Sequence, residues 1–155
     1  MKRAGISDGL HDLSFEFFYW FSRFEFALKE CGYLKSKKVG AKAEASWDRF
    51  IDNHAEAYVL SNSGSALIEA APQRQIVGAA DLEFAPVTFA AADCDLKKVV
   101  TLSNTVRNNL FHGGKHGHAT WDDPERVRLL LSLVIQILDE LAEHAGFEAD
   151  YRRSY

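Results

Sequence analysis

Residues 12–31 read DLSFEFFYWFSRFEFALKEC, and this stretch decides the fold, because its apolar positions recur at helical spacing. At about 100° per residue, one broad stripe holds Leu13, Phe17, Trp20, Phe21, Phe24, Ala27, Leu28 and Cys31. Phe15, Tyr19 and Phe26 point roughly the opposite way, and Phe18 lies at the edge of the stripe. A helix that is apolar on two sides is either central in its own fold or shared with a second subunit. We therefore predict a helix over residues 12–31 that ends at Gly32 and has an extra surface to bury.

Three further helices are predicted downstream, over residues 41–60, 95–112 and 123–144. The last of these has the clearest limits, with Asp123 as N-cap, Pro124 at the first position and Gly146 just past the end. Its apolar residues cover well over half of its circumference, so it too presents more apolar surface than one partner helix needs. They are Leu129, Leu130, Leu131, Leu133, Val134, Ile135, Ile137, Leu138 and Leu141.

The remaining chain gives weaker patterns. We interpret residues 61–65, Ser-Asn-Ser-Gly-Ser, as a linker, and between residues 66 and 95 we expect a short helix with an extended piece at 75–77 or 83–85. No repeat or long linker divides the 155 residues, a length typical of one domain. The prediction is thus a single all-α domain over residues 1–155, an antiparallel bundle of four main helices with short extra elements.

Composition and charge exclude several classes of protein. Eighteen basic against 22 acidic residues exclude a uniformly basic nucleic-acid coat, although a local basic site remains compatible with a net charge of −4. Cys31 and Cys94 lack metal-finger spacing, and we expect reduced, buried thiols in a cytoplasmic protein. The longest apolar stretch, residues 129–138, is interrupted by Ser132 and Gln136 and is too short to cross a bilayer, so we expect no membrane association.

Residues 96–118 form a basic span without any acidic residue, and such a span attracts phosphates. It contains Lys97, Lys98, Arg107, Lys115, His112, His116 and His118. For Lys97 and Lys98 we favour a solvated helix face. The three histidines could also serve as zinc ligands, but no acidic or cysteine ligand lies near them in the sequence. We therefore expect neither a metal nor a cofactor.

Arg107 is a charged residue on the apolar side of the third predicted helix. It falls within the apolar arc between Leu96 and Val100, where a guanidinium is costly unless it is paired or faces a cleft; a simple alternative is that its side chain reaches solvent. Asn108 and His112 lie one turn apart on the polar side of this helix. His112 occupies the last turn before Gly113-Gly114, where backbone carbonyls favour its protonated form. A guanidinium, an amide and an imidazole together suit phosphodiester chemistry. The alternative is that His112 only caps the C-terminal end of the helix, as a lone histidine at a helix end more often does.

The stretch Arg107-Asn108-Asn109-Leu110-Phe111-His112 resembles the Arg-x4-His motif of HEPN domains (higher eukaryotes and prokaryotes nucleotide-binding). In that family the motif stands near the end of a late helix in an all-α bundle. The aromatic first helix with its Arg23-Phe24-Glu25 step, the Gly113-Gly114 exit and the closing apolar helix are similar to many members. A tyrosine found two residues after the histidine in one toxin subgroup is Gly114 here, so the nucleotidyl modification of that tyrosine is not carried over.

The resemblance implies a homodimer whose two motifs face each other and, in many members, metal-independent cleavage of RNA. His112 would serve as general base or acid, Arg107 would hold the scissile phosphate, and Asn108 would orient His112 or bind phosphate. From the basic span and the polar side of the helix we expect Asn104, Lys115 and His116 to contact RNA. The implied role is a toxin or antiviral nuclease, whose further partner would be a cognate antitoxin or defence-system protein. The alternatives are a non-catalytic HEPN module that binds nucleotide or RNA or only dimerises, and a helical adaptor for an unrelated partner.

Two geometric expectations accompany this hypothesis. Glu25 lies at the edge of the apolar stripe of its helix, just as Arg107 lies within the apolar arc of its own. We therefore expect the two side chains to pair directly or through water. The alternative is that each side chain reaches solvent separately. Arg107 also lies about 140° around the helix from His112, which favours a site shared across a two-fold axis. The alternative is that the Gly113 exit turns His112 back toward Arg107 within one subunit.

Overall fold

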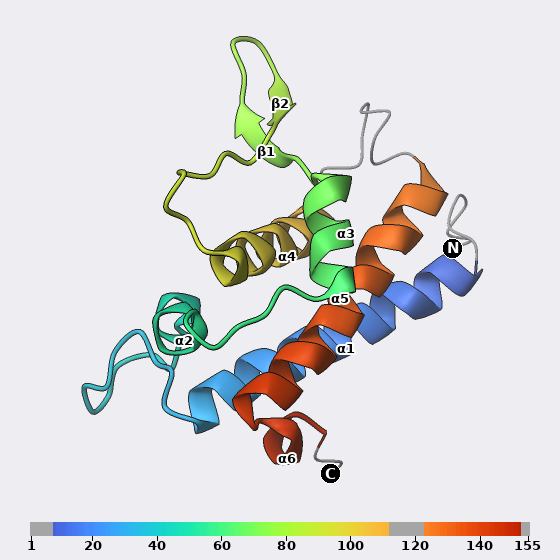
Figure 1. Cartoon of the computed structure of the whole chain (residues 1–155). Helices are drawn as coiled ribbons and strands as arrows, with labels where there is room; N and C mark the ends of the chain where they lie inside the picture. The colour runs from blue at the N-terminus through green and yellow to red at the C-terminus, as the bar shows by residue number, and fades with distance from the viewer. Residues whose placement is uncertain (1–7, 112–122, 153–155) are drawn as a thin grey trace.

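Two long helices lying side by side form the centre of the molecule. The computed structural model describes residues 8–111 and 123–152, and in it α1 (Asp8–Glu30) packs along α5 (Pro124–Ala145) (Figure 1). The carboxylate of Asp123 caps the start of α5, and Gly146, at φ 71°, ends it. The buried side chains that α1 and α5 contribute to the core include Phe17, Phe21, Phe24, Leu28, Leu130, Leu131, Val134, Ile137, Leu138 and Leu141. The prediction of a mainly helical chain is confirmed.

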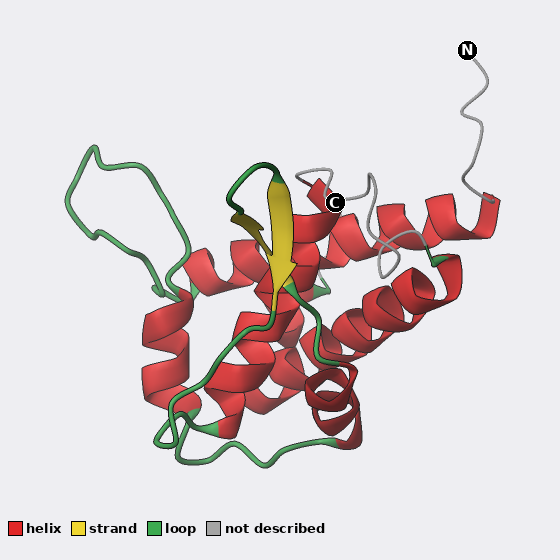
Figure 2. Ribbon diagram, turned by 90° about the horizontal axis from the view of Figure 1, so that it is seen from above, coloured by secondary structure: helices red, strands yellow, loops and turns green. Residues whose placement is uncertain are grey.

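Shorter elements surround this pair. They are α2 (Trp47–His54), α3 (Asn62–Ala70), α4 (Asp95–Phe111) and α6 (Glu148–Tyr151), with the strands β1 (Arg74–Val77) and β2 (Leu82–Ala85). The strands form an antiparallel hairpin in which Arg74 lies opposite Ala85. Figure 1 shows this hairpin extending away from the helices, and Figure 2 shows it in yellow from above. Both of the extended pieces that were considered as alternatives are therefore present, one as each strand.

The second predicted helix is much shorter than the sequence pattern suggested. Residues 41–46 are not helical, because their backbone bonds to the chain that follows α1: the Lys35 amide donates to the Glu44 carbonyl and the Ser46 amide to the Tyr33 carbonyl. The Ser46 side chain then caps α2. The helix also ends at His54, so the predicted range of 41–60 was wrong at both ends.

Residues 61–65 are not a linker but the start of α3. The Ser61 hydroxyl accepts a hydrogen bond from the Gly64 amide as the N-cap, and the Glu140 carboxylate of α5 accepts hydrogen bonds from Ser61 and Ser63. A Cβ added to Gly64 would lie 3.2 Å from the Val99 side chain, so glycine lets α3 approach α4 closely. The serines that suggested a flexible segment are capping and docking groups.

The connection between α3 and β1 is tied to the ends of two other helices. The Asn109 amide, near the end of α4, donates to the Gln73 carbonyl at 2.7 Å. The Arg126 guanidinium, near the start of α5, donates to the Ala70 carbonyl at the same distance. We call residues 70–73 the strap, and it fixes the base of the hairpin beside the end of α4.

Aromatic rings join α1 to α2 and to α6. Phe24 is fully buried; its ring stacks on Trp47 at a centroid distance of 5.1 Å and meets Phe50 at 5.8 Å. On its other side it meets Phe147 and Tyr151, each at 6.0 Å. Trp47 is thus a packing residue, and one side chain of α1 fixes both α2 and α6.

Arg23 fastens α6 to α1 from inside the protein. It is only 5% exposed; its Nε donates to the Tyr151 carbonyl at 3.2 Å and its Nη2 to the Asp150 carbonyl. Its guanidinium also lies 4.9 Å from the centroid of the Phe26 ring. Arg23 and Phe24, the first two residues of the Arg23-Phe24-Glu25 step, therefore attach the C-terminal helix to α1.

Two further expectations concerned the burial of the cysteines and the absence of a membrane-spanning helix. Cys31 is exposed and Cys94 half-buried, so the expectation of buried thiols was wrong. Within residues 8–111 and 123–152, every helix is either too short or too polar to span a membrane.

Replacing Arg23 by leucine should lower the free energy of unfolding by about 2–4 kcal/mol, because two buried carbonyls lose their donor. Urea denaturation followed by circular dichroism measures this loss. Arg49→Leu, which changes an exposed arginine of α2, serves as the matched control and should shift stability by less than about 0.5 kcal/mol. Equal effects of the two substitutions would contradict the assigned role of Arg23.

Candidate nucleic-acid site at the end of α4

Arg107 lies near the C-terminal end of α4, across aromatic rings of two helices. Its guanidinium carbon is 5.0 Å from the ring centroid of Phe111 and 6.0 Å from that of Phe21. Its Nη1 donates to the Asn108 side-chain oxygen at 3.1 Å. A delocalised guanidinium is weakly hydrated and stacks well on aromatic faces, so these contacts hold the charge half-buried.

Arg107 also faces a cavity of about 310 Å³, which we call the Arg107 cavity. The residues that line it are Glu25, Lys29, Lys35, Lys42, Ala43, Glu44, Ala45 and Arg107. Four cations and two carboxylates therefore share one hollow, formed by α1, α4 and the connection between α1 and α2. Of the alternatives that the sequence left open for Arg107, namely pairing, a cleft or solvent, this placement corresponds to a cleft.

Glu44 organises two of the four cations. Lys42 Nζ lies 2.7 Å and Lys35 Nζ 3.2 Å from its carboxylate oxygens. Hydrogen bonds from Lys42 and Lys35 lower the pKa of Glu44, and the bond to Glu44 raises the pKa of Lys42. The carboxylate of Glu44 therefore stays ionised and the ammonium group of Lys42 stays charged across the physiological range. Two lysines are thereby held together at the rim of the cavity.

Glu25 is oriented by a neighbour other than Arg107. Its Oε1 accepts a hydrogen bond from Trp47 Nε1 at 3.4 Å. Among the described residues there is no ion pair between Glu25 and Arg107 within 4.0 Å, yet both side chains line the same cavity. Direct pairing is therefore not observed, and coupling through water in the cavity stays a prediction.

The other predicted residues fall into two groups. Asn108 is exposed beside Arg107, whereas the Asn104 amide is half-buried and donates to the Val100 carbonyl of its own helix at 3.1 Å. His112, Lys115 and His116 lie outside the described residues, so their predicted roles stay predictions.

The first turn of α4 behaves as a solvated face. Lys97 pairs with Asp93 at 2.6 Å and Lys98 with Asp95 at 3.2 Å. The bond to Asp93 raises the pKa of Lys97. These acids lie just before the basic span, so they offset its charge at the end far from Arg107.

A second basic segment was missed in the sequence analysis. Lys29, Lys35 and Lys42 line the cavity of Arg107, although they precede it by 65 residues or more. A signal was available, because five of the nine lysines of the chain fall within residues 29–42. This cluster lies far from the motif in sequence and meets Arg107 only through the fold.

Exposed aromatic rings adjoin the site. Phe15, Phe18 and Phe111 are 64%, 47% and 45% exposed, and Tyr19 beside them is 38% exposed. The rings of Phe18 and Phe111 lie 5.5 Å apart, which links the outer side of α1 to the end of α4. We call these four residues the aromatic face. Of the second apolar side predicted for the first helix, Phe15 and Tyr19 are exposed, whereas Phe26 is half-buried against Arg23.

Within residues 8–111 and 123–152, no group of three or more His, Cys, Asp or Glu side chains is arranged to hold a metal ion. Comparison of the chain with family models, curated proteins and solved structures finds no match. The geometry of the site is therefore the evidence from which a function is inferred.

Glu25 and Arg107 should be energetically coupled across the cavity they share. A double-mutant cycle with Glu25→Gln and Arg107→Gln should give a coupling energy of about 0.5 kcal/mol or more, which decreases as salt is added. Glutamine retains an acceptor for Trp47, so the cycle isolates the charge. A parallel cycle with Glu16→Gln, an exposed position of α1, should give none. Zero coupling in both cycles would contradict the predicted pairing.

Proposed function

We propose that this chain is a metal-independent endoribonuclease of HEPN type, built on an antiparallel helical bundle and acting as a toxin or antiviral nuclease. The observation that carries the proposal is the position of Arg107, half-buried beside Asn108 at the end of α4 and facing a cation-lined cavity. A guanidinium in such a place suits a phosphate oxygen, because it offers several donors in a fixed planar geometry.

The proposed reaction needs only groups that the RNA and the motif contain. The ribose 2′-oxygen attacks the adjacent phosphorus, the bond from phosphorus to the 5′-oxygen breaks, and the products end in a 2′,3′-cyclic phosphate and a 5′-hydroxyl. One proton leaves the 2′-hydroxyl and one reaches the departing 5′-oxygen, and His112 serves as the base or the acid. Arg107 stabilises the charge that develops on the phosphate, while Asn108 orients His112 or binds phosphate.

We further propose that the active species is a symmetric homodimer. The aromatic face is a sizeable exposed apolar surface, and Phe111 connects it directly to Arg107. Burial of such a surface against its own copy would bring two α4 ends together. The like charges gathered there would be tolerated because an anionic phosphate binds between them.

The protein should cleave RNA in the presence of EDTA and leave 2′,3′-cyclic phosphate ends. His112→Ala should lower the rate by about 10²–10⁴-fold, as expected for loss of a general acid or base, while Arg107→Gln should also remove most activity. Lys98→Gln, at the far end of α4, is the matched control and should keep wild-type activity. Gel assays with end-group analysis measure these rates.

Cleavage that stops on chelation, or that survives loss of His112, would overturn this mechanism. RNA binding that depends on Arg107 without any cleavage would instead identify a non-catalytic module.

The dimer should depend on the aromatic face and should share its site between protomers. Phe15→Ser with Phe18→Ser should give a monomer in light scattering and lose activity, whereas Val59→Ser, at another exposed apolar position, should not. Mixing the inactive Arg107→Gln and His112→Ala proteins should restore activity, because each protomer supplies the group that the other lacks. An active monomer, or no rescue on mixing, would contradict the shared site.

A further inference from the structure

The connection between α1 and α2 concentrates positive charge on a projecting part of the molecule. Residues 29–42 contain Lys29, Lys35, Lys37, Lys38 and Lys42 against the single carboxylate of Glu30, although the whole chain is acidic. We call residues 35–44 the lysine loop. Figure 1 shows the connection extending away from the helices beside α2.

The lysine loop is held in a defined shape. Backbone bonds pair Lys35 with Glu44, the bridge between Leu34 and Ala45 closes its base, and the Ala41 amide donates to the Lys38 carbonyl. Gly40 turns the chain at φ 85°, a conformation that glycine adopts readily. Because the base is fixed, the ammonium groups are presented from a stable stem.

One side of the loop faces the site at the end of α4. Lys35 and Lys42, held together by Glu44, line the Arg107 cavity with Lys29. A phosphate at Arg107 would therefore have further cations along the same hollow, in the direction of the loop.

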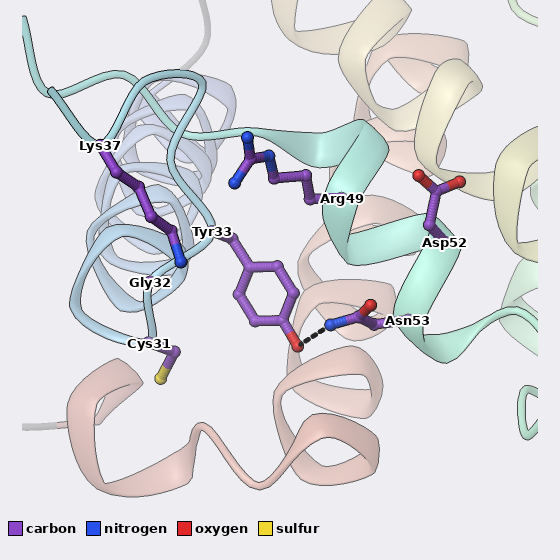
Figure 3. A pocket seen from close by; sticks show the side chains of 7 residues that line it. All are labelled: Cys31, Gly32, Tyr33, Lys37, Arg49, Asp52 and Asn53. Carbon is purple, nitrogen blue, oxygen red and sulfur yellow. Dashed lines mark hydrogen bonds between the residues drawn. The ribbon is translucent and has the colours of Figure 1, made fainter.

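The other side of the loop borders a second polar hollow. This hollow has a volume of about 420 Å³ and lies between the end of α1 and α2. Lys37 reaches into it from the loop and Arg49 from α2 (Figure 3). Cations therefore line both hollows that border the loop, with Asp52 as the carboxylate of the second.

We propose that the lysine loop binds the backbone of single-stranded RNA and extends the binding surface from the Arg107 cavity toward Lys37 and Arg49. The identity of the ligand as RNA rests on the proposed function. Backbone binding needs spaced cations rather than base-reading groups, and each bound phosphate releases counterions. The loop contributes such cations from a segment far from the motif in sequence.

The composition of the loop favours a nucleic-acid backbone over an acidic protein partner. The central parts of protein interfaces are enriched in aromatic residues and arginine and depleted in lysine. Residues 35–44 contain four lysines and no aromatic residue or arginine. A flexible, strongly hydrated ammonium group makes non-specific contacts with phosphates well.

The test compares two double variants that each remove two ion-paired lysines. Lys35→Gln with Lys42→Gln breaks the pairs with Glu44, and Lys97→Gln with Lys98→Gln breaks those with Asp93 and Asp95. Binding is followed by fluorescence anisotropy, with an uncleavable 2′-O-methyl oligonucleotide of about 20 nucleotides, long enough to span several sites. Thermal unfolding of all proteins checks that the fold is retained.

The loop variant should bind about tenfold more weakly at 0.1 M salt, and its salt dependence should fall by about 1.4 in log–log slope, or 0.7 for each lost phosphate contact. The control variant should bind like the wild-type protein. Equal binding by all three proteins, or equal weakening of both variants, would overturn the proposal, and the first result would assign the loop to an acidic protein partner instead.

The outcome is separable from that of the proposed function, because the oligonucleotide is not cleaved. Loop-dependent binding by a protein that cleaves no RNA would support the loop and refute the nuclease. If the protein cleaves RNA but binds it equally well without Lys35 and Lys42, the nuclease would be supported and the role of the loop refuted. A wild-type protein that binds no RNA would overturn both.

Discussion

The burial of Phe24 between α2 and the C-terminal segment is the contact on which the rest of the structure depends. Its ring packs on Trp47 and Phe50 of α2 and on Phe147 and Tyr151 near the C-terminus. Because Trp47 also donates to Glu25, the same contact fixes where the connection between α1 and α2 meets the site. Loss of a buried phenylalanine costs about 3–5 kcal/mol, and here it would also displace the wall of the Arg107 cavity.

The limits of α5 and the end of α1 were predictable from local sequence. The start of α1, which lies at Asp8 rather than at residue 12, and the limits of the short helices were not. α5 shows its Asp123 cap and its Gly146 stop in the sequence, and the apolar stripe of α1 is readable over five turns. The start of α2 depends instead on hydrogen bonds between residues 33–35 and 44–46, which no helical period reveals. For α3 the capping serine was visible at position 61, but the surrounding small polar residues resembled a linker equally well.

The candidate site was predictable in part for a similar reason. Arg107 stands out on a helical wheel as a charge among apolar residues, and the structure places it on a cavity. Its cavity neighbours Lys29, Lys35 and Lys42 come from a distant segment, and their proximity results from tertiary packing. A search for the densest lysine cluster would have identified that segment without showing that it meets α4.

The strap has a consequence for how the molecule can vary. Asn109 and Arg126 hold carbonyls only three residues apart, so one short piece of chain sets the spacing between the end of α4 and the start of α5. A change in the length of residues 70–73 would therefore shift the Arg107 end of α4 relative to α5 without altering any residue that lines the Arg107 cavity.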